Sequence, residues 1–280
     1  MIRKLSPAKV NLHLRVLRKR DDGYHDIETL LQQISLYDEM IFTPVAQGIV
    51  VRCPDSSLPE NERNIVYRAA HALLSDASCP QGIHITLKKN IPVAAGLGGG
   101  SSNAATTLIA VNEMYGLRYR TDDLMRIGST LGADVPFFIH GKAMWATGIG
   151  DKLQPVLHAP TLWFVLINPK FEISTKMVYE NFNFRLTNRA VKYSYSGLYT
   201  VEDLLNGLYN DLERVTLNLY PVLQRLKNLL LKEGARGALM SGSGPTVFGL
   251  FTDEEKAVHA EKSLRKLGAD AWSVWRAHSL

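Results

Sequence analysis

The sequence is poor in the residues on which several classes of protein depend. It has only two cysteines, Cys53 and Cys79, and they show no metal-ligand spacing. We therefore expect reduced thiols and a cytoplasmic location. Residues 1–6 lack the apolar core of a signal peptide. No run of about 18 apolar residues occurs, which excludes a membrane-spanning helix.

Long blocks of like charge are also missing. The 32 lysines and arginines exceed the 27 aspartates and glutamates, for a net charge of +5. The one basic cluster, Arg18 to Arg20, is followed directly by Asp21 and Asp22, which is typical of a solvated hairpin tip rather than of a nucleic-acid site. We expect neither a nucleic acid nor a membrane as partner. The small positive excess suits an anionic, phosphorylated substrate.

What the chain has instead is one glycine-rich stretch ahead of a run of helix formers. It reads Pro92, Val93, Ala94, Ala95, Gly96, Leu97, Gly98, Gly99, Gly100, Ser101, Ser102, Asn103. Glycines let a backbone approach a ligand closely, and a helix N-terminus offers unpaired N–H groups and a positive dipole end. Such a stretch can be only a sharp turn, but four glycines and two serines favour a phosphate site.

The spacing of these glycines excludes the two commonest phosphate loops. No lysine follows Gly100, so the stretch is not a Walker A loop. The glycine spacing does not match Gly-x-Gly-x-x-Gly either, which excludes a dinucleotide-binding fingerprint. The loop belongs to a third class, which other parts of the chain must identify.

Alternating helical and strand-like patterns predict an α+β protein of two domains, 1–156 and 157–280, with the boundary near residues 155–160. The N-terminal strand, 5–18, is expected to be half-buried, with a polar face. Apolar runs over 33–52 read as strands broken at Pro44 and Gly48, and Thr121 reads as an N-cap. The remaining expected strands are 82–88, 142–147, 161–167, 237–251 (with a turn at 241–245) and 271–276, and the expected helices are 64–77, 104–116, 121–131, 175–183, 201–208, 221–233 and 253–267. Residues 185–199 read as a polar loop.

Three separated elements could converge on one phosphoryl-transfer site. The polar face of the first strand carries Lys9, Asn11 and His13, and the glycine loop is the second element. The third is Asp134, whose neighbours in the sequence are apolar, so that its carboxylate needs a partner. Lys9 is the natural candidate, and the pair could accept a hydroxyl proton. The alternatives are a structural ion pair and a helix cap. The turn at 241–245 is either a plain hairpin turn or a second wall of the site.

Four motifs in this order, Lys9-Val10-Asn11-Leu12, residues 92–103, residues 132–138 and residues 241–245, resemble the GHMP small-molecule kinases. The resemblance covers essentially the whole chain. It implies a two-domain GHMP kinase fold, with an N-terminal ATP-binding domain related to ribosomal protein S5 domain 2 and a C-terminal substrate domain. It also implies phosphorylation of an alcohol by ATP, with Mg²⁺.

Within that family, residues 9–12, 22–25 and 210–213 are similar to members whose substrate is a cytidine-diphosphate sugar alcohol. The resemblance implies that Asp134 is the general base and Lys9 its electrostatic partner. It assigns the triphosphate to 92–103, the adenine pocket to Asn64 and Ile65, and substrate binding to Asn11, Tyr24, His25, Thr175 and Tyr179. His25 would read the edge of the cytosine between the rings of Tyr24 and Tyr179, although each of these residues taken singly is more often explained by packing than by ligand stacking.

The remaining expectations concern the metal ligands, one glycine variant and the rival functions. No carboxylate cage for a metal is visible, so Mg²⁺ would be held by phosphates, waters and Ser101 or Ser102. We expect Gly99→Val to weaken ATP binding by placing a side chain where the backbone meets phosphate. The rival functions are a kinase of this family for another alcohol, such as homoserine or mevalonate, and a nucleotide-binding module without catalysis.

Overall fold

The computed structural model describes residues 1–156, 160–183 and 200–280, so the predicted polar loop at 185–199 lies outside the described residues. The described chain forms two compact units. The first unit comprises residues 1–8, 36–92 and 98–141, and the second comprises 9–35, 93–97 and 142–280. Because these units are built from interleaved segments, the family-domain boundary near residue 156 stays a prediction.

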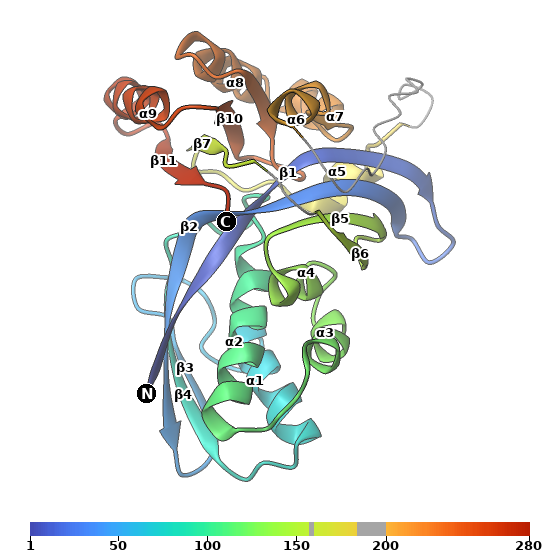
Figure 1. The fold of residues 1–280 in the computed structure, drawn as a ribbon, viewed down its shortest axis with the longest axis vertical. Coiled ribbons are helices and arrows are strands. Elements are labelled where there is room, and N and C mark those ends of the chain that lie inside the picture. The colour runs from blue at the N-terminus through green and yellow to red at the C-terminus, as the bar shows by residue number, and fades with distance from the viewer. Residues whose placement is uncertain (157–159, 184–199) are drawn as a thin grey trace. The chain divides into compact units, whose positions relative to one another are not determined.

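The first unit packs four helices with a strand assembly (Figure 1). β3 (Ile49–Arg52) pairs in parallel with β4 (Gly82–Lys88), and β4 pairs antiparallel with the second half of β2 (His25–Val45). The helices are α1 (Ile65–Asp76), α2 (Gly99–Tyr115), α3 (Thr121–Ser129) and α4 (Val135–His140). The apolar face of α1, including Val66, Ala69 and Leu73, is buried, as its 3.6-residue spacing predicts.

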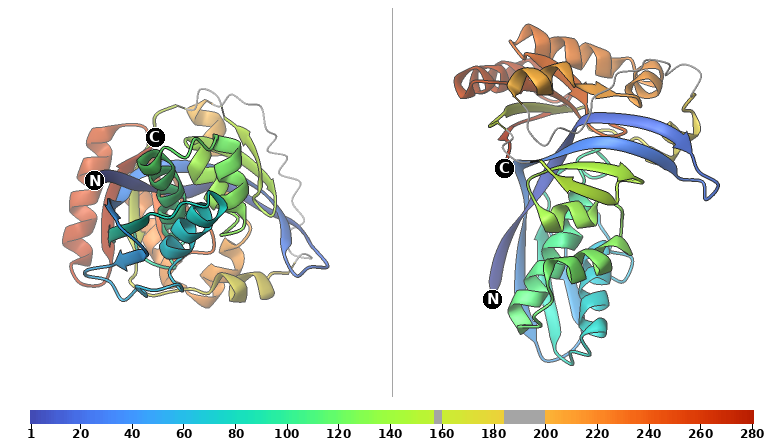
Figure 2. Two further views of the ribbon diagram at one scale, coloured as in Figure 1. Left: turned by 90° about the horizontal axis from the view of Figure 1, so that it is seen from below. Right: turned by 45° about the vertical axis from the view of Figure 1, so that its right-hand side comes forward.

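The second unit contains a four-stranded antiparallel sheet of order β11-β7-β10-β9. Its strands are β7 (Trp163–Asn168), β9 (Gly237–Met240), β10 (Val247–Phe251) and β11 (Ser273–His278). Helices α8 (Val222–Lys232) and α9 (Glu254–Gly268) pack on this sheet (Figures 1 and 2). Their apolar residues form one core with the sheet, which includes Leu226, Leu264 and Phe251.

The second unit also takes most of β1 (Ile2–Lys19) and the first half of β2. There, β5 (Ala143–Gly148) pairs with β2 and with β6 (Lys152–Pro155), and β8 (Tyr209–Asn210) pairs with β1. The short helices α5 (Thr175–Glu180), α6 (Val201–Asn206) and α7 (Glu213–Leu219) complete it. The predicted α+β class is confirmed.

Three local predictions are wrong. The first strand is not half-buried: Lys9, Asn11 and His13 are buried, because their polar groups bond one another and nearby backbone inside the unit. Pro44 does not break β2, because it lies one residue from the strand's end, where one missing N–H costs little. The N-cap of α3 is Arg120 rather than Thr121, and the Asp123 carboxylate accepts the Arg120 N–H.

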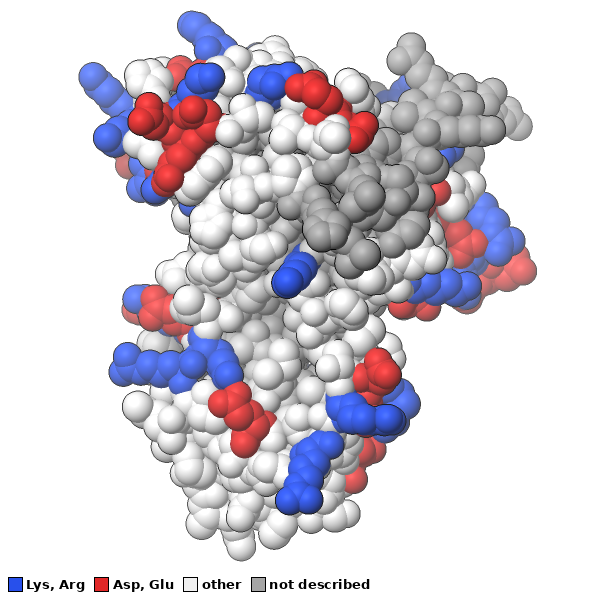
Figure 3. All heavy atoms as spheres, in the orientation of Figure 1, with Lys and Arg blue, Asp and Glu red and all other residues white. Residues whose placement is uncertain are grey.

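Charged side chains on the face drawn in Figure 3 mix both signs. Lysines and arginines lie beside aspartates and glutamates there, and neither sign forms a continuous patch on that face among the described residues. The basic triplet is itself paired with acidic residues, since Arg18 and Arg20 both form ion pairs with Asp26. The triplet therefore forms the solvated hairpin tip that its sequence predicts.

Candidate active site

The glycine stretch ends in the N-terminus of α2, in the first unit. Gly98 is the N-cap, with a left-handed φ of 69°, and it offers no side chain to the first turn. No acidic residue lies in that turn. The first N–H groups of a 17-residue helix and its positive dipole end are thus arranged as an anion site.

Two adjacent glycines of this turn differ in what surrounds them. A Cβ on Gly99 would lie 3.0 Å from Ile91 Cγ2 and 3.2 Å from Lys89 Nζ, so a side chain at Gly99 would point into the protein and press on these two side chains. A Cβ on Gly100 would meet only Ile65 Cγ2, at 4.0 Å, and Gly100 is exposed. The expected reason for an effect of Gly99→Val is therefore wrong, and Gly100 is the glycine that faces open space.

The segment carrying Asp134 lies beside this turn, within the same unit. A Cβ on Gly132 would be 3.7 Å from Ser101 Oγ, and α2 packs against α4. Asp134 is the N-cap of α4, yet its side chain makes no capping hydrogen bond. Within the described part of the first unit, its carboxylate has no hydrogen bond or ion pair. The first unit thus places a half-buried carboxylate close to the proposed phosphate site.

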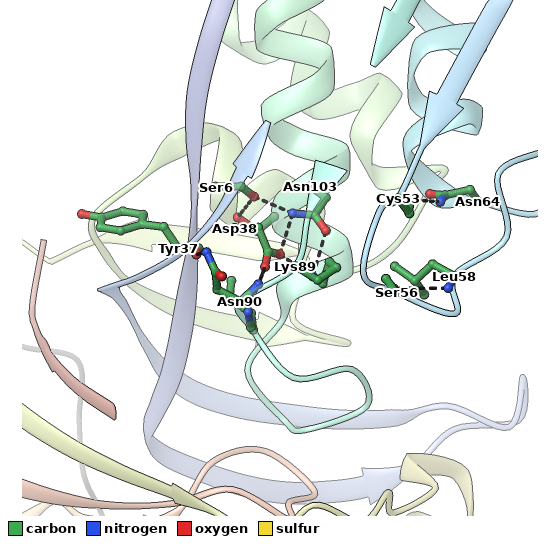
Figure 4. Close-up of polar contacts among 12 residues, drawn as sticks. Ser6, Tyr37, Asp38, Cys53, Ser56, Leu58, Asn64, Lys89, Asn90 and Asn103 are labelled. Atoms are coloured by element: carbon green, nitrogen blue, oxygen red, sulfur yellow. Dashed lines mark hydrogen bonds and ion pairs between the residues drawn. The ribbon is translucent and has the colours of Figure 1, made fainter. Parts of the chain in front are cut away.

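The proposed adenine residues have different surroundings. Asn64 is the N-cap of α1: its Oδ1 accepts the Val66 N–H at 2.9 Å, and its Nδ2 donates to the Pro59 carbonyl at 2.7 Å. Its side chain is buried and holds the start of the helix, and its Nδ2 also contacts Cys53 Sγ (Figure 4). Ile65 lies next to Gly100. The structure therefore places Ile65, rather than the Asn64 amide, along the approach to the α2 N-terminus.

Lys9 lies in the second unit, at the end of a chain of buried polar groups. Its Nζ donates to Asn11 Oδ1 at 2.5 Å, and Asn11 Nδ2 donates to Thr29 Oγ1 at 2.9 Å. The Thr29 hydroxyl in turn donates to the His13 carbonyl at 2.6 Å. Asn11 thus orients the ammonium of Lys9. Because Lys9 and Asp134 belong to different units, their pairing stays a prediction.

His13, on the same strand, makes contacts within the protein that give it a structural role. Its Nδ1 donates to the Gly207 carbonyl at 2.8 Å, and its ring centroid lies 5.7 Å from that of Trp145 and 5.8 Å from that of Tyr209. Burial lowers the pKa of His13 below the ordinary value for histidine. The ring therefore stays neutral near pH 7.

The first part of the glycine stretch is attached to the turn at 241–245. The Lys9 N–H donates to the Leu97 carbonyl at 2.9 Å, and Ser241 Oγ donates to the Gly96 carbonyl at 2.9 Å. A Cβ on Gly96 would be 2.0 Å from the Ser241 carbonyl oxygen, and one on Gly242 would be 3.5 Å from Asn11 Oδ1. The turn is therefore more than a hairpin connection, because it supports both the loop and the strand that carries Lys9.

Ala94, in this part of the loop, has a backbone conformation that favours glycine. Ala94 has a φ of 50°, a left-handed conformation that costs an L-residue roughly 1–2 kcal/mol. The structure shows that this alanine is held under strain.

The proposed substrate residues gather in the second unit. The rings of His25 and Tyr179 are stacked, with centroids 4.9 Å apart and planes at 28°, and Tyr24, next to His25, is 61% exposed. Burial, and then the charge of Lys19, lower the pKa of His25. Thr175 Oγ1 shares a hydrogen bond of 2.8 Å with Ser243 Oγ, so the N-terminus of α5 contacts the turn at 241–245.

Sequence reasoning missed two buried polar residues, Thr29 and Asp38. Thr29 connects Asn11 to β1, and no motif marks it. Asp38 alternates along its strand with Leu36, Met40 and Phe42, which are buried, and a carboxylate at such a position requires buried partners, but those partners are distant in the sequence.

Neither a metal cluster nor a membrane-spanning helix occurs among the described residues. No group of three or more histidine, cysteine, aspartate or glutamate side chains in the described ranges could hold a metal ion. Within the same ranges, no helix has the length and apolar character to cross a membrane.

Comparisons with known proteins place this arrangement in a family. Residues 64–142 match the family model of the GHMP kinases N terminal domain, and residues 196–270 match that of the GHMP kinases C terminal domain. The chain belongs to the GHMP kinases. It is therefore a phosphotransferase of a family that uses ATP.

Individual proteins similar to this chain carry names that point to one reaction within the family. The chain is 58% identical to the 4-diphosphocytidyl-2-C-methyl-D-erythritol kinase of Syntrophus aciditrophicus over the whole of both chains. It is 47% identical to the enzyme of the same name from Syntrophotalea carbinolica, over 99% of this chain and 97% of that one. A crystal structure of 4-(cytidine 5'-diphospho)-2C-methyl-D-erythritol kinase matches with a TM-score of 0.86, at 35% identity over 99% of each chain. Homoserine kinase from Cytophaga hutchinsonii, at 22% identity and a TM-score of 0.74 over 100% of this chain and 94% of that one, shares the fold.

Proposed function

We propose that this protein transfers a phosphoryl group from ATP to the 2-hydroxyl of 4-diphosphocytidyl-2-C-methyl-D-erythritol. The products are ADP and the 2-phosphate, and the reaction belongs to non-mevalonate isoprenoid precursor biosynthesis. The observation that carries the proposal is 58% identity to a kinase of that name over the full length of both chains. The arrangement of polar and aromatic residues within each unit supports it.

The chemistry falls to Asp134 and Lys9. The Asp134 carboxylate accepts the proton of the acceptor hydroxyl as the oxygen attacks the terminal phosphorus of ATP. The Lys9 ammonium, oriented by Asn11, stabilises the charge that develops on the transferred group. The support for Asp134 is that Gly132, two residues before it, lies near Ser101, and that the Asp134 side chain makes no capping hydrogen bond.

The nucleotide is held by residues 92–103. The N–H groups of the first turn of α2 bind the phosphates, and Ile65 contributes an apolar wall for the adenine. Mg²⁺ bound to ATP would neutralise charge on the phosphates. Of the two serines, Ser101 fits it better, because Ser102 is fully buried and its Oγ accepts a hydrogen bond from Ser6 at 2.8 Å.

The cytosine is recognised by Tyr24, His25 and Tyr179. A neutral imidazole presents one donor and one acceptor, as reading a base edge requires, and the lowered pKa of His25 keeps it neutral. Tyr179, whose ring stacks with that of His25, covers one face of the base. The exposed ring of Tyr24 then covers the other face of the base.

The direct test is ADP release, measured by a coupled assay with the cytidine-diphospho substrate, homoserine and mevalonate in parallel. We expect rapid turnover of the first and negligible turnover of the others. Turnover of homoserine or mevalonate alone would establish the rival kinase activity. ATP binding without turnover of any alcohol would establish the non-catalytic module.

Acidic pH provides a separate test of His25. Because its pKa lies below 6.5, we expect the KM for the cytidine substrate to stay constant from about pH 8 to 6.5 and to rise below that, as protonation removes the acceptor. His25→Gln keeps a donor and an acceptor but does not titrate, so its KM should show no such rise. An identical rise in both proteins would contradict the role of His25.

A further inference from the structure

The carboxylate of Asp38 connects the two chain segments that flank the glycine loop (Figure 4). Asp38 lies on β2 and is 0% exposed. Its Oδ1 accepts the backbone N–H groups of Asn90 and Ile91, both at 2.8 Å. These are the last residues before the loop begins at Pro92.

The other oxygen of the carboxylate faces the segment that follows the loop. Asp38 Oδ2 accepts from Asn103 Nδ2 at 2.9 Å and forms an ion pair with Lys89 Nζ. Lys89 Nζ also donates to Asn103 Oδ1 at 3.1 Å. One carboxylate therefore accepts four hydrogen bonds, from the chain that enters the loop and from the helix that leaves it.

The same network reaches into the first turn of α2. Asn103 Nδ2 donates to Ser6 Oγ at 2.9 Å, and Ser6 Oγ donates to Ser102 Oγ at 2.8 Å. Ser6, Ser102 and Asn103 are buried, so water cannot replace a lost partner. All of these residues belong to the first unit.

We propose that Asp38 is a positioning residue for ATP, acting by fixing the separation between Ile91 and Asn103. This proposal rests on the proposed function, because it takes residues 92–103 as the triphosphate site. A loop whose ends are fixed loses less conformational freedom when it closes around a ligand. A buried ion pair is weak evidence for stability, since its desolvation cost can exceed its attraction. We therefore assign the Asp38 carboxylate the role of fixing the positions of the two ends of the loop, rather than that of stabilising the fold.

Asp38→Asn is the sharpest variant, because it preserves shape. The new amide must point its NH₂ at donors in either orientation: at the Asn90 and Ile91 N–H groups, or at Lys89 and Asn103. We expect KM for ATP and Kd for ADP to rise about tenfold or more, with KM for the cytidine substrate unchanged within about twofold. We also expect faster amide hydrogen exchange at Asn90 and Ile91.

Leu73→Ala serves as the matched control for lost stability. Leu73 is 0% exposed in α1 of the same unit, and its truncation destabilises through a cavity without touching the network. Its KM for ATP should stay near that of the unmodified protein even where its unfolding midpoint falls as far as that of Asp38→Asn. Asn103→Ala combined with Asp38→Asn should add little to the single change, as expected for two members of one network.

The outcomes separate the two proposals. If the unmodified protein binds no ADP, the nucleotide function itself fails. If it binds ADP and Asp38→Asn binds equally well, or if Leu73→Ala raises KM for ATP as much, the positioning role is overturned while the kinase function stands. A rise in KM for both substrates alike would also overturn it.

Discussion

Asp134→Ala is expected to lower kcat by about a hundredfold or more, within the range of 10²–10⁴ that general bases contribute, while ATP still binds. The variant should remain folded, because Asp134 makes no capping hydrogen bond to α4 and is only half-buried. Single-turnover phosphorylation measures the chemical step, and equilibrium dialysis with ADP measures binding.

Asp122→Ala is the control for this experiment. Asp122 is exposed in the first turn of α3, in the same unit, so its loss should leave both measurements unchanged. Asp134→Asn keeps the size of the side chain and should be as inactive as the alanine variant. Retained turnover in either Asp134 variant would remove this residue from the role of base.

Gly100→Val is expected to weaken ATP binding by at least tenfold, about 1.4 kcal/mol. The valine side chain would meet little of the protein, so it should obstruct only a ligand that approaches the N–H groups of α2. The midpoint of thermal unfolding should change little. Titration with ADP and differential scanning calorimetry measure the two quantities.

Gly99→Val supplies the contrast, because there the new side chain collides with Ile91 and Lys89. We expect this neighbouring variant to lower the unfolding midpoint. Gly100→Ala, with a smaller side chain, should weaken binding less than Gly100→Val. If Gly100→Val binds ADP as tightly as the unmodified protein, the phosphates lie elsewhere.

Local signals in the sequence were sufficient for most of the fold. The strand at 82–88, the glycine loop and the helix ending at Gly116 all follow from spacing and from glycine's tolerance of left-handed backbone. The burial of the first strand could not be read in this way. Polar residues on one face usually indicate solvent, and the buried Asn11 amide donates to Thr29, a partner 18 positions away in the sequence.

The same limit applies to the candidate site. Motifs located Lys9, Asp134 and the loop, because each is embedded in a distinctive local pattern. Asp38 escaped notice because the residues it bonds lie 51 to 65 positions further along the chain. A network of this kind is visible only once the chain has folded.

The interleaved construction of the two units has a consequence for how the protein is made. The chain passes between the units five times, so residues 9–35 must wait during synthesis for partners in 142–280. All segments of the first unit have been made once residue 141 is added, but the second unit also needs residues 142–280, and contacts of such long sequence separation form slowly. We expect truncated chains to be substrates for chaperones and proteases, and exchange of one family domain for a homologous segment to fail unless all the interleaved segments are exchanged together.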